Sequence, residues 1–208
     1  GRATGALALQ VLVSVWPMLL PIDSRSGIPM TSIHTERALE DEICRDLAAA
    51  GWLHEAGDAA RYDRALALFP DDVAGWIQTT QPEAWASIEQ THGANARKVV
   101  CERLRRTLAD HGTLHVLRQG FEMLGLRRPI ATAQFKPALA MNAELQAKYA
   151  ANRLRVVRQL RYSLHNENCL DLGLFVNGIP VATCEIKTDY TQAVEDAVLQ
   201  YRKDRPPR

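Results

Sequence analysis

The chain has 208 residues, of which 47% are hydrophobic and 24% are charged. These values are ordinary for a globular chain of one or two domains, and they exclude a disordered tail, a collagen and a disulfide-rich miniprotein. The 25 Lys and Arg residues nearly balance the 24 Asp and Glu residues, so the formal net charge is only +1. Taken as a whole, the chain is therefore not an overtly basic nucleic-acid-binding protein.

Charged residues are distributed unevenly along the chain. Residues 31–90 contain 4 basic and 12 acidic side chains, whereas residues 97–161 contain 14 basic and 4 acidic ones. An acidic half therefore precedes a basic stretch with a net charge of +10. Such asymmetry indicates a polyanionic partner, which the near-zero overall charge conceals.

The four cysteines form no C-x-x-C pair and have no His at zinc-finger spacing, which argues against a structural zinc site. They are Cys44, Cys101, Cys169 and Cys184. Scattered single cysteines are typical of small buried hydrophobic residues in a reducing cytoplasm. We therefore expect a cytoplasmic protein without disulfides.

The two ends of the chain are expected to lie outside the folded domain. Residues 5–22 are strongly apolar and resemble a signal-peptide core, but they are too short and too interrupted by proline for a spanning helix. A good helix start follows Met30 at once. We therefore expect an extension over residues 1–30, a single domain over 31–205, the start of a linker at 206–208 and no membrane association.

The first half of the domain is predicted to be helical. Leu39, Ile43 and Leu47 recur on one face of a helix over residues 36–50, and Gly51 suits the position after its end. Pro82 suits the first turn of another helix. The remaining pattern predicts a helical insertion around residues 71–118, with helices at 71–76, 82–92 and 94–109 and a continuation of the last one over 111–118. The helix at 94–109 is amphipathic and basic, and its basic residues form either a solvated face or a phosphate-binding face.

The second half is predicted to contain most of the strands. Residues 120–135 suggest one or two strands, and Asn142 suits the N-cap of a helix over 142–151. Alternation from Arg153 predicts another strand. Asn177-Gly178 is a strong hairpin signal. The last predicted elements are strands at 169–176 and 180–187 and a helix at 188–203.

Three polar residues of this hairpin could carry chemistry. Glu185 and Lys187 share one face of the return strand because side chains alternate, while Ile186 points into a core. Asp171 lies on the preceding strand. Two carboxylates offer the hard oxygen ligands that Mg²⁺ prefers, and a lysine can orient a water molecule or offset charge on a phosphate. The alternative is a polar strand face with a surface ion pair.

The register of the hairpin decides whether the two carboxylates can meet. A regular two-residue turn at Asn177-Gly178 pairs Asp171 with Cys184 and places Asp171 and Glu185 on opposite faces. A bulge or a three-residue turn restores the shared face. A metal site here therefore predicts a bulged hairpin or a three-residue turn.

The residues around this hairpin carry a resemblance to a known family: Arg158-Gln159-Leu160-Arg161-Tyr162-Ser163, Asp171, Asn177-Gly178-Ile179-Pro180-Val181, Glu185-Ile186-Lys187 and residues 197–205. They resemble the N-terminal nuclease domain of the R subunit of type I restriction–modification enzymes, a member of the PD-(D/E)xK nuclease superfamily. The resemblance runs from about Thr35 to the C-terminus and is most specific over 153–205. It implies an α/β, restriction-endonuclease-like fold whose mixed, mostly antiparallel sheet is flanked by helices.

By this resemblance, the chain is a type I site-specific deoxyribonuclease, an endonuclease that cleaves double-stranded DNA with Mg²⁺ in an ATP-dependent complex. Asp171 and Glu185 would hold the metal, and Lys187 would assist the attacking water. Glu36 or Glu40 could add a further carboxylate, the alternative for each being a solvated helix acid.

The resemblance also suggests DNA contacts. Arg158 and Arg161 could position the DNA backbone without reading its sequence, and they lie on opposite faces if their strand is regular. The same roles are open to Arg153 and Arg155, and ion pairs with neighbours are the alternative for all four arginines. The family's Q-x-x-x-Y element, which would place Gln200 and Tyr201 on DNA, is not intact because Asp204 stands four residues after Gln200.

The implied partners are double-stranded DNA, separate methyltransferase and specificity subunits, and an ATP-driven motor on the same full-length chain. No P-loop motif is present, so ATP is not expected to bind to these 208 residues. Two rival functions remain open at this point: a non-catalytic DNA-binding or assembly module of the same fold, and the nuclease of another defence helicase system.

Overall fold

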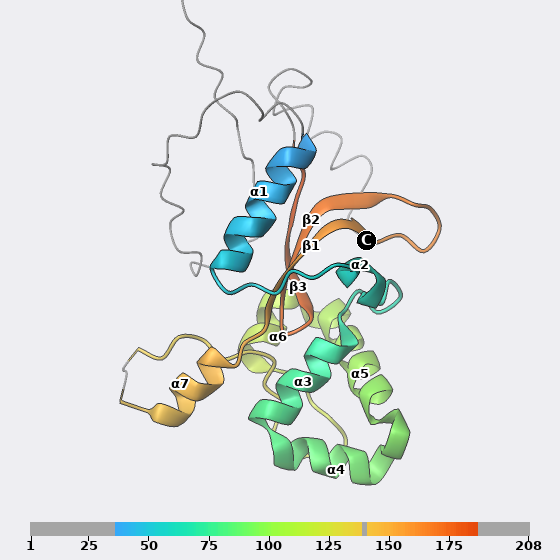
Figure 1. Ribbon diagram of the computed structural model, residues 1–208. Coiled ribbons are helices and arrows are strands. Elements are labelled where there is room, and N and C mark those ends of the chain that lie inside the picture. Colours follow the sequence, from blue (N-terminus) through green and yellow to red (C-terminus); the bar gives the residue numbers. More distant parts are fainter. Residues whose placement is uncertain (1–35, 139–140, 187–208) are drawn as a thin grey trace, which may run out of the picture.

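The structure is a computed structural model that describes residues 36–138 and 141–186. It combines helices with a three-stranded antiparallel sheet of order β1-β2-β3, as Figure 1 shows, and the predicted α/β fold is confirmed. The strands are β1 (Leu154–Arg161), β2 (Cys169–Val176) and β3 (Ile179–Cys184). The helical elements are α1 (Glu36–Ala49), α2 (Asp58–Arg61), α3 (Pro70–Thr80), α4 (Pro82–His92), the 3₁₀ turn η1 (Gly93–Asn95), α5 (Ala96–His111), α6 (Thr113–Gln119) and α7 (Ala143–Ala150).

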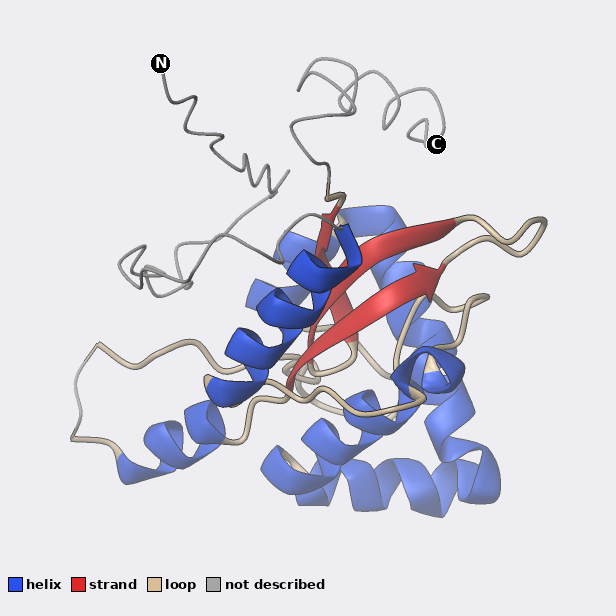
Figure 2. Ribbon diagram, turned by 45° about the horizontal axis from the view of Figure 1, so that its top comes forward, coloured by secondary structure: helices blue, strands red, loops and turns tan. Residues whose placement is uncertain are grey.

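Helix α1 covers one face of the sheet, as Figure 2 shows. Its predicted apolar face packs with buried Cys44 against strand residues such as Val156 and Leu172. The helix ends where expected, because Gly51 adopts a left-handed φ of 93° and donates its N–H to Ala48. Trp52 then packs back on the same core. The prediction of a helix over 36–50 is confirmed.

Helices α3 to α6 form a second core beside the sheet, in the lower part of Figure 1. Trp76, Val100, Leu104 and Val116 are among its buried members. Proline occupies the first turn of both α3 and α4, where its missing N–H costs nothing. The predicted helical insertion is confirmed, although α3 extends beyond residues 71–76 and Gly112, with a φ of 80°, makes α6 a helix separate from α5.

The prediction of strands over residues 120–135 is wrong. The described segment forms only an isolated bridge between Phe121 and Ile130, and both side chains lie in the helical core. Side chains satisfy the backbone that a strand would have used: Gln81 bonds both the N–H and the carbonyl of Ala131, and the Trp76 indole donates to the same carbonyl. The backbone of Ala131 therefore bonds to side chains of α3 and of its C-cap residue Gln81, and it does not pair with a strand.

Most of the remaining predicted elements agree with the structure, but the return strand expected over 180–187 ends at Cys184, so Glu185 and Ile186 lie beyond it. Asn142 caps α7 by accepting the N–H of Leu145 at 3.0 Å. β1 and β2 match the expected strands, and Asn177-Gly178 forms a tight turn with φ of 49° and 81°. In residues 36–138 and 141–186, no helix has the length and apolar character needed to cross a membrane. The predicted helix at 188–203, the extension at 1–30 and the linker at 206–208 lie outside the described residues.

The tight turn of the β2–β3 hairpin is pressed against the start of α3. A Cβ added to Gly178 would lie 2.4 Å from the carbonyl oxygen of Phe69, and the Phe69 N–H donates to the Gly178 carbonyl at 3.0 Å. Gly178→Ala is therefore expected to lower the free energy of unfolding by about 3 kcal/mol, from the left-handed φ and the clash together. Urea unfolding measures this loss.

Gly125→Ala is the matched control for this prediction. Gly125 has a similar φ of 89°, but nothing lies within 4 Å of its added Cβ. Gly125→Ala should therefore lower the free energy of unfolding only by the cost of a left-handed φ for alanine, about 1 kcal/mol. Equal losses in the two variants would show that the contact between the turn and Phe69 does not constrain the hairpin.

Candidate functional site

The β2–β3 hairpin contains the register irregularity that a shared carboxylate face requires. Its tight turn pairs Val176 with Ile179, and the pairing then shifts by one residue, so that Leu174 lies opposite Ala182. Val181 is the extra residue of this β-bulge. The shifted register then continues along the hairpin to the pair Leu172 and Cys184. This is the last registered pair, and Glu185 follows directly after the end of β3.

Backbone and packing fix the two carboxylates further. Oδ2 of Asp171 accepts the N–H of Ile186 at 2.7 Å, so the segment that carries Glu185 also orients Asp171. Ile186 is only 2% exposed and packs in the core beneath α1, as predicted. Oε1 of Glu185, the residue before Ile186, is shielded from solvent.

The electrostatics of Cys184 reflect these neighbours. Burial, and then the negative charges of Asp171 and Glu185, raise the pKa of the Cys184 thiol to about 11. The thiol thus stays protonated at neutral pH, and it is a poor metal ligand in that form. Cys44 and Cys101 are also buried, and burial raises their pKa values to about 11 and about 12. These three cysteines are the buried hydrophobic residues that the sequence predicted.

The donor set at Asp171 and Glu185 fits Mg²⁺ better than a tightly chelated metal. Within residues 36–138 and 141–186, no group of three or more His, Cys, Asp or Glu side chains could hold a metal ion. Mg²⁺ commonly uses one or two carboxylates and completes its shell with water and substrate phosphate. The carboxylates of Asp171 and Glu185 are ligands of this kind.

Glu40 does not behave as a solvated helix acid. It is 4% exposed, and its Oε2 accepts hydrogen bonds from Nε and Nη2 of Arg158 at 3.1 and 3.0 Å. Its Oε1 accepts the Gln159 Nε2–H at 3.0 Å. Gln159 lies between Arg158 and Leu160 on β1, which pair with Leu172 and Leu170, the neighbours of Asp171 on β2. Glu40 therefore connects α1 to the part of β1 that runs beside Asp171.

Gln159 was not singled out by the sequence. Its φ of 48° is left-handed, which is unusual for a residue within a strand, and it interrupts the alternation of β1. Arg158 and Gln159 consequently both bond to Glu40 on the α1 side. The strand is not regular, so the expectation that Arg158 and Arg161 lie on opposite faces does not hold. No local sequence signal marks this conformation, because glutamine has no preference for it.

The four arginines of this stretch divide into different environments. Arg158 is paired with Glu40 and Asp41, whereas Arg161 is 59% exposed and pairs with Glu167 at 3.0 Å. Arg155 is buried. Arg155 pairs with Asp72, and Nη1 of Arg153 lies 3.4 Å from Oδ1 of the same aspartate. Ion pairs, the alternative to DNA contacts, are thus present at all four positions.

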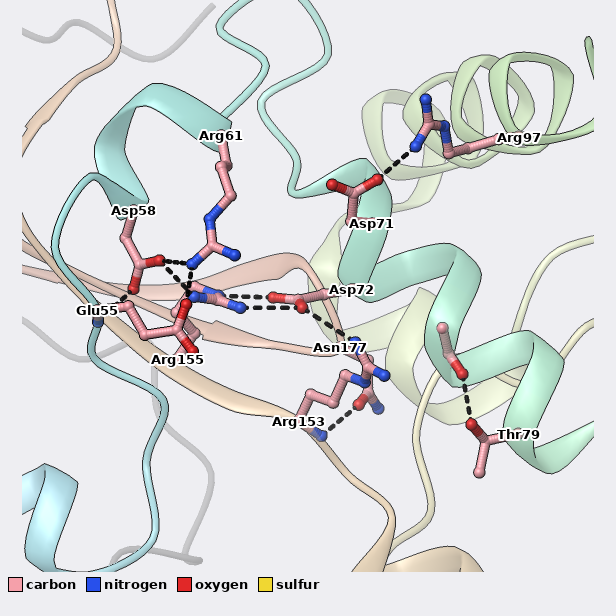
Figure 3. A network of polar contacts seen from close by, with 11 residues as sticks. Glu55, Asp58, Arg61, Asp71, Asp72, Thr79, Arg97, Arg153, Arg155 and Asn177 are labelled. Carbon is pink, nitrogen blue, oxygen red and sulfur yellow. Dashed lines mark hydrogen bonds and ion pairs between the residues drawn. The ribbon is translucent and has the colours of Figure 1, made fainter.

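Arg155 is the centre of a buried ion network, drawn in Figure 3. Its Nε and Nη2 donate to Asp72 at 2.7 and 3.0 Å, and its Nη1 donates to Asp58 at 2.7 Å. This network joins β1 to α2 and α3. A cavity of about 390 Å³ is lined by members of this network, among them Arg153 and Arg155, and by neither Asp171 nor Glu185. Arg155 is therefore a structural residue rather than a phosphate contact.

Several predicted residues cannot be placed. Lys187, Gln200 and Tyr201 lie outside the described residues. Glu36 begins α1, but its side chain is not described. Their proposed roles therefore stay predictions.

Comparison with known proteins identifies the family. No curated protein and no solved structure gives a significant match. A family model described as the type I restriction enzyme R protein N terminus matches residues 34–208, and the match spans the sheet, the helical insertion and the hairpin that carries Asp171 and Glu185. The chain therefore belongs to the family of the type I restriction enzyme R protein N terminus.

Proposed function

We propose that this chain is the nuclease domain of a type I restriction enzyme R subunit and that it cleaves double-stranded DNA with Mg²⁺. The observation that carries the proposal is the hydrogen bond of 2.7 Å from the Ile186 N–H to Oδ2 of Asp171, which brings Asp171 to the segment that contains Glu185. The β-bulge at Val181 supports it, because the shifted register pairs Leu172 with Cys184, the neighbours of these two carboxylates. Membership of the R protein family supports the same assignment.

In this proposal, Asp171 and Glu185 hold the metal ion. A bound Mg²⁺ would polarise the phosphodiester and lower the pKa of a water molecule. Ile186 positions both carboxylates, since its side chain anchors the segment in the core and its N–H holds Asp171. Lys187 orients the attacking water and offsets the charge that develops on the phosphate. Glu40 supports the site through Gln159.

The proposal extends to the complex in which the domain works. It acts as a type I site-specific deoxyribonuclease in an ATP-dependent assembly, with an ATP-driven motor on the same full-length chain. Methyltransferase and specificity subunits choose the DNA site. Arg161 contacts the DNA backbone near the carboxylates, and Gln200 and Tyr201 are further candidates for DNA contact.

Cleavage of plasmid DNA by the complete restriction complex tests this function. With ATP and Mg²⁺ present, Lys187→Ala is expected to reduce the cleavage rate by about 100-fold or more, because the charge on the phosphate then lacks its stabilising cation. Chelation of Mg²⁺ should stop cleavage by the unaltered complex. Lys148→Ala is the control, since Lys148 lies on α7 and forms an exposed pair with Glu144.

The two rival functions give different results in this assay. A complex that binds DNA but never cleaves it would support a non-catalytic assembly module. Cleavage that is unchanged by Lys187→Ala would contradict the catalytic role of Lys187. Cleavage that needs no specificity subunit would favour the nuclease of another defence helicase system.

A further inference from the structure

An exposed group of three charged residues lies at the open end of the β1–β2 hairpin. Nη1 of Arg161, the last residue of β1, lies 3.0 Å from Oε2 of Glu167 in the connecting loop. Nη1 of Arg64, in the segment after α2, lies 3.7 Å from the other oxygen of the same carboxylate. Arg64 also donates to the Ser163 carbonyl at 3.3 Å. These residues are called the Arg64–Glu167–Arg161 cluster below.

The cluster holds two guanidinium groups against a single carboxylate. The side chains of Arg161 and Glu167 are 59% and 69% exposed, and that of Arg64 is 34% exposed. Exposed ion pairs of this kind contribute little to stability, so folding does not require the arrangement. Guanidinium groups bind carboxylate and phosphate oxygens with similar geometry. The position of the Glu167 carboxylate is therefore one that a phosphate group can occupy.

The position of the cluster relates it to the carboxylate pair. Arg161 is registered with Cys169 on β2, and Asp171 follows Cys169 by two residues. Two residues of an extended strand span about 7 Å, so the backbone position at which Arg161 meets β2 is about 7 Å along the strand from Asp171. DNA whose phosphodiester approached Asp171 would bring neighbouring phosphates to this end of the sheet.

We propose that the Arg64–Glu167–Arg161 cluster binds a backbone phosphate of duplex DNA and that Glu167 occupies the position of this phosphate in the free protein. The inference rests on the proposed function, and it assigns a role to Arg64 and Glu167 that family membership does not supply. The basic stretch over residues 97–161, with its net charge of +10, favours a polyanion over an acidic protein segment as the occupant. Glu167 thus competes with DNA within the same molecule.

Binding measurements in EDTA test this inference without any contribution from cleavage. The full-length protein is titrated into a fluorescently labelled 30-base-pair duplex, and anisotropy gives Kd at several salt concentrations. Glu167→Gln is expected to tighten binding by about two- to fivefold, because the competing carboxylate is gone while the side chain keeps its size. Arg64→Gln should weaken binding and lower the slope of log Kd against log salt by about 1.

Glu144→Gln is the matched control. It removes one negative charge from an exposed pair with Lys148 on α7, a helix that does not contribute to the cluster. A general charge effect would tighten binding equally in both glutamate variants, and that result would overturn the inference. Unchanged DNA binding by the Glu167→Gln variant would overturn the inference as well. It would do so even if the variant altered the binding of a protein subunit.

A crosslinking measurement provides a local readout. Leu164 lies in the same loop and is 64% exposed, so p-benzoylphenylalanine at this position should crosslink to the duplex. The same group at Leu124, which is 97% exposed in the segment between α6 and α7, should not. Crosslinks at Leu124 but not at Leu164 would contradict the inference.

The two proposals can fail separately. If the protein cleaves DNA but the Glu167→Gln variant binds DNA no more tightly, the proposed nuclease function stands and the proposed phosphate site fails. If the Glu167→Gln variant binds DNA more tightly but Lys187→Ala leaves cleavage unchanged, the proposed phosphate site stands and the catalytic role of Lys187 fails.

Discussion

Replacement of Asp171 by Asn is expected to reduce DNA cleavage by about 1,000-fold or more, since a metal-ligand charge that stabilises the transition state by several kcal/mol is lost. The fold should be preserved. An amide oxygen at this position can still accept the N–H of Ile186, which Oδ2 of Asp171 now accepts at 2.7 Å. The substitution therefore removes the charge and keeps the contact, and cleavage with thermal unfolding measured on the same sample separates the two effects.

Asp110→Asn is the control with the same chemical change. Asp110 is exposed on α5, distant in sequence from the hairpin, and its substitution should leave both cleavage and unfolding unchanged. Increasing the Mg²⁺ concentration should partly restore cleavage by the Asp171→Asn variant, because the defect is one of metal affinity. If Asp171→Asn cleaves DNA at the normal rate, the carboxylate pair does not hold the metal ion.

The local elements could be predicted because their signals are local. Gly51 ends α1, Asn142 caps α7 and Asn177-Gly178 forms the hairpin turn, each for a reason contained in the residue itself. The strands expected at 120–135 fail for the opposite reason. Whether Ala131 pairs with a strand or with the Gln81 side chain is decided by a residue 50 positions away, and no periodicity carries that information.

The candidate site shows the same division. The sequence predicted that a shared carboxylate face requires a bulge or a three-residue turn in this hairpin, and the structure has a bulge at Val181. The burial of Glu40 could not be anticipated, because it requires Arg158 and Gln159 from a strand more than a hundred residues away. The left-handed φ of Gln159 has no compositional signal at all.

The charges of the arginines were evident from the sequence, but their environments were not. Arg155 and Arg161 belong to one strand and to the same basic stretch. Arg155 is 5% exposed because α2 and α3 each bring an aspartate to it, whereas Arg161 stands at the open end of the hairpin. Net charge along a sequence therefore identifies a region that can face a polyanion, but the tertiary partners decide which of its cations are accessible.

Arg155→Met is expected to lower the free energy of unfolding by about 3 kcal/mol, since it removes the buried cation that two buried aspartates share and leaves them only the more exposed Arg61 and Arg153. Asp58 and Asp72 are each 3% exposed, and Figure 3 shows the guanidinium of Arg155 between them. Arg97→Met is the control: Arg97 pairs with Asp71 on the surface, and its loss should cost no more than about 1 kcal/mol. Urea unfolding at neutral pH measures both.

The effect of Arg155→Met should depend on pH in a defined direction. Burial alone would raise the pKa of Asp58, but hydrogen bonds from the Glu55 N–H and the Arg61 guanidinium, together with Arg155, lower it below its ordinary value of 3.8. The ionised Asp58 therefore stabilises the fold above that pH, and this stabilisation is lost as the pH falls through the lowered pKa. Arg155→Met removes part of the lowering, so the difference in stability between the two proteins should be largest at neutral pH and should narrow below pH 3.8.

A second substitution distinguishes a buried charge from lost packing. In Arg155→Met, the additional change Asp72→Asn removes the buried charge that has lost most of its hydrogen bonds, and it should recover part of the lost stability. The same Asp72→Asn change in the unaltered protein should destabilise it, because Arg155 then loses the partner that binds two of its nitrogens. If Asp72→Asn instead destabilises both backgrounds equally, the network stabilises the junction of β1, α2 and α3 through shape rather than charge.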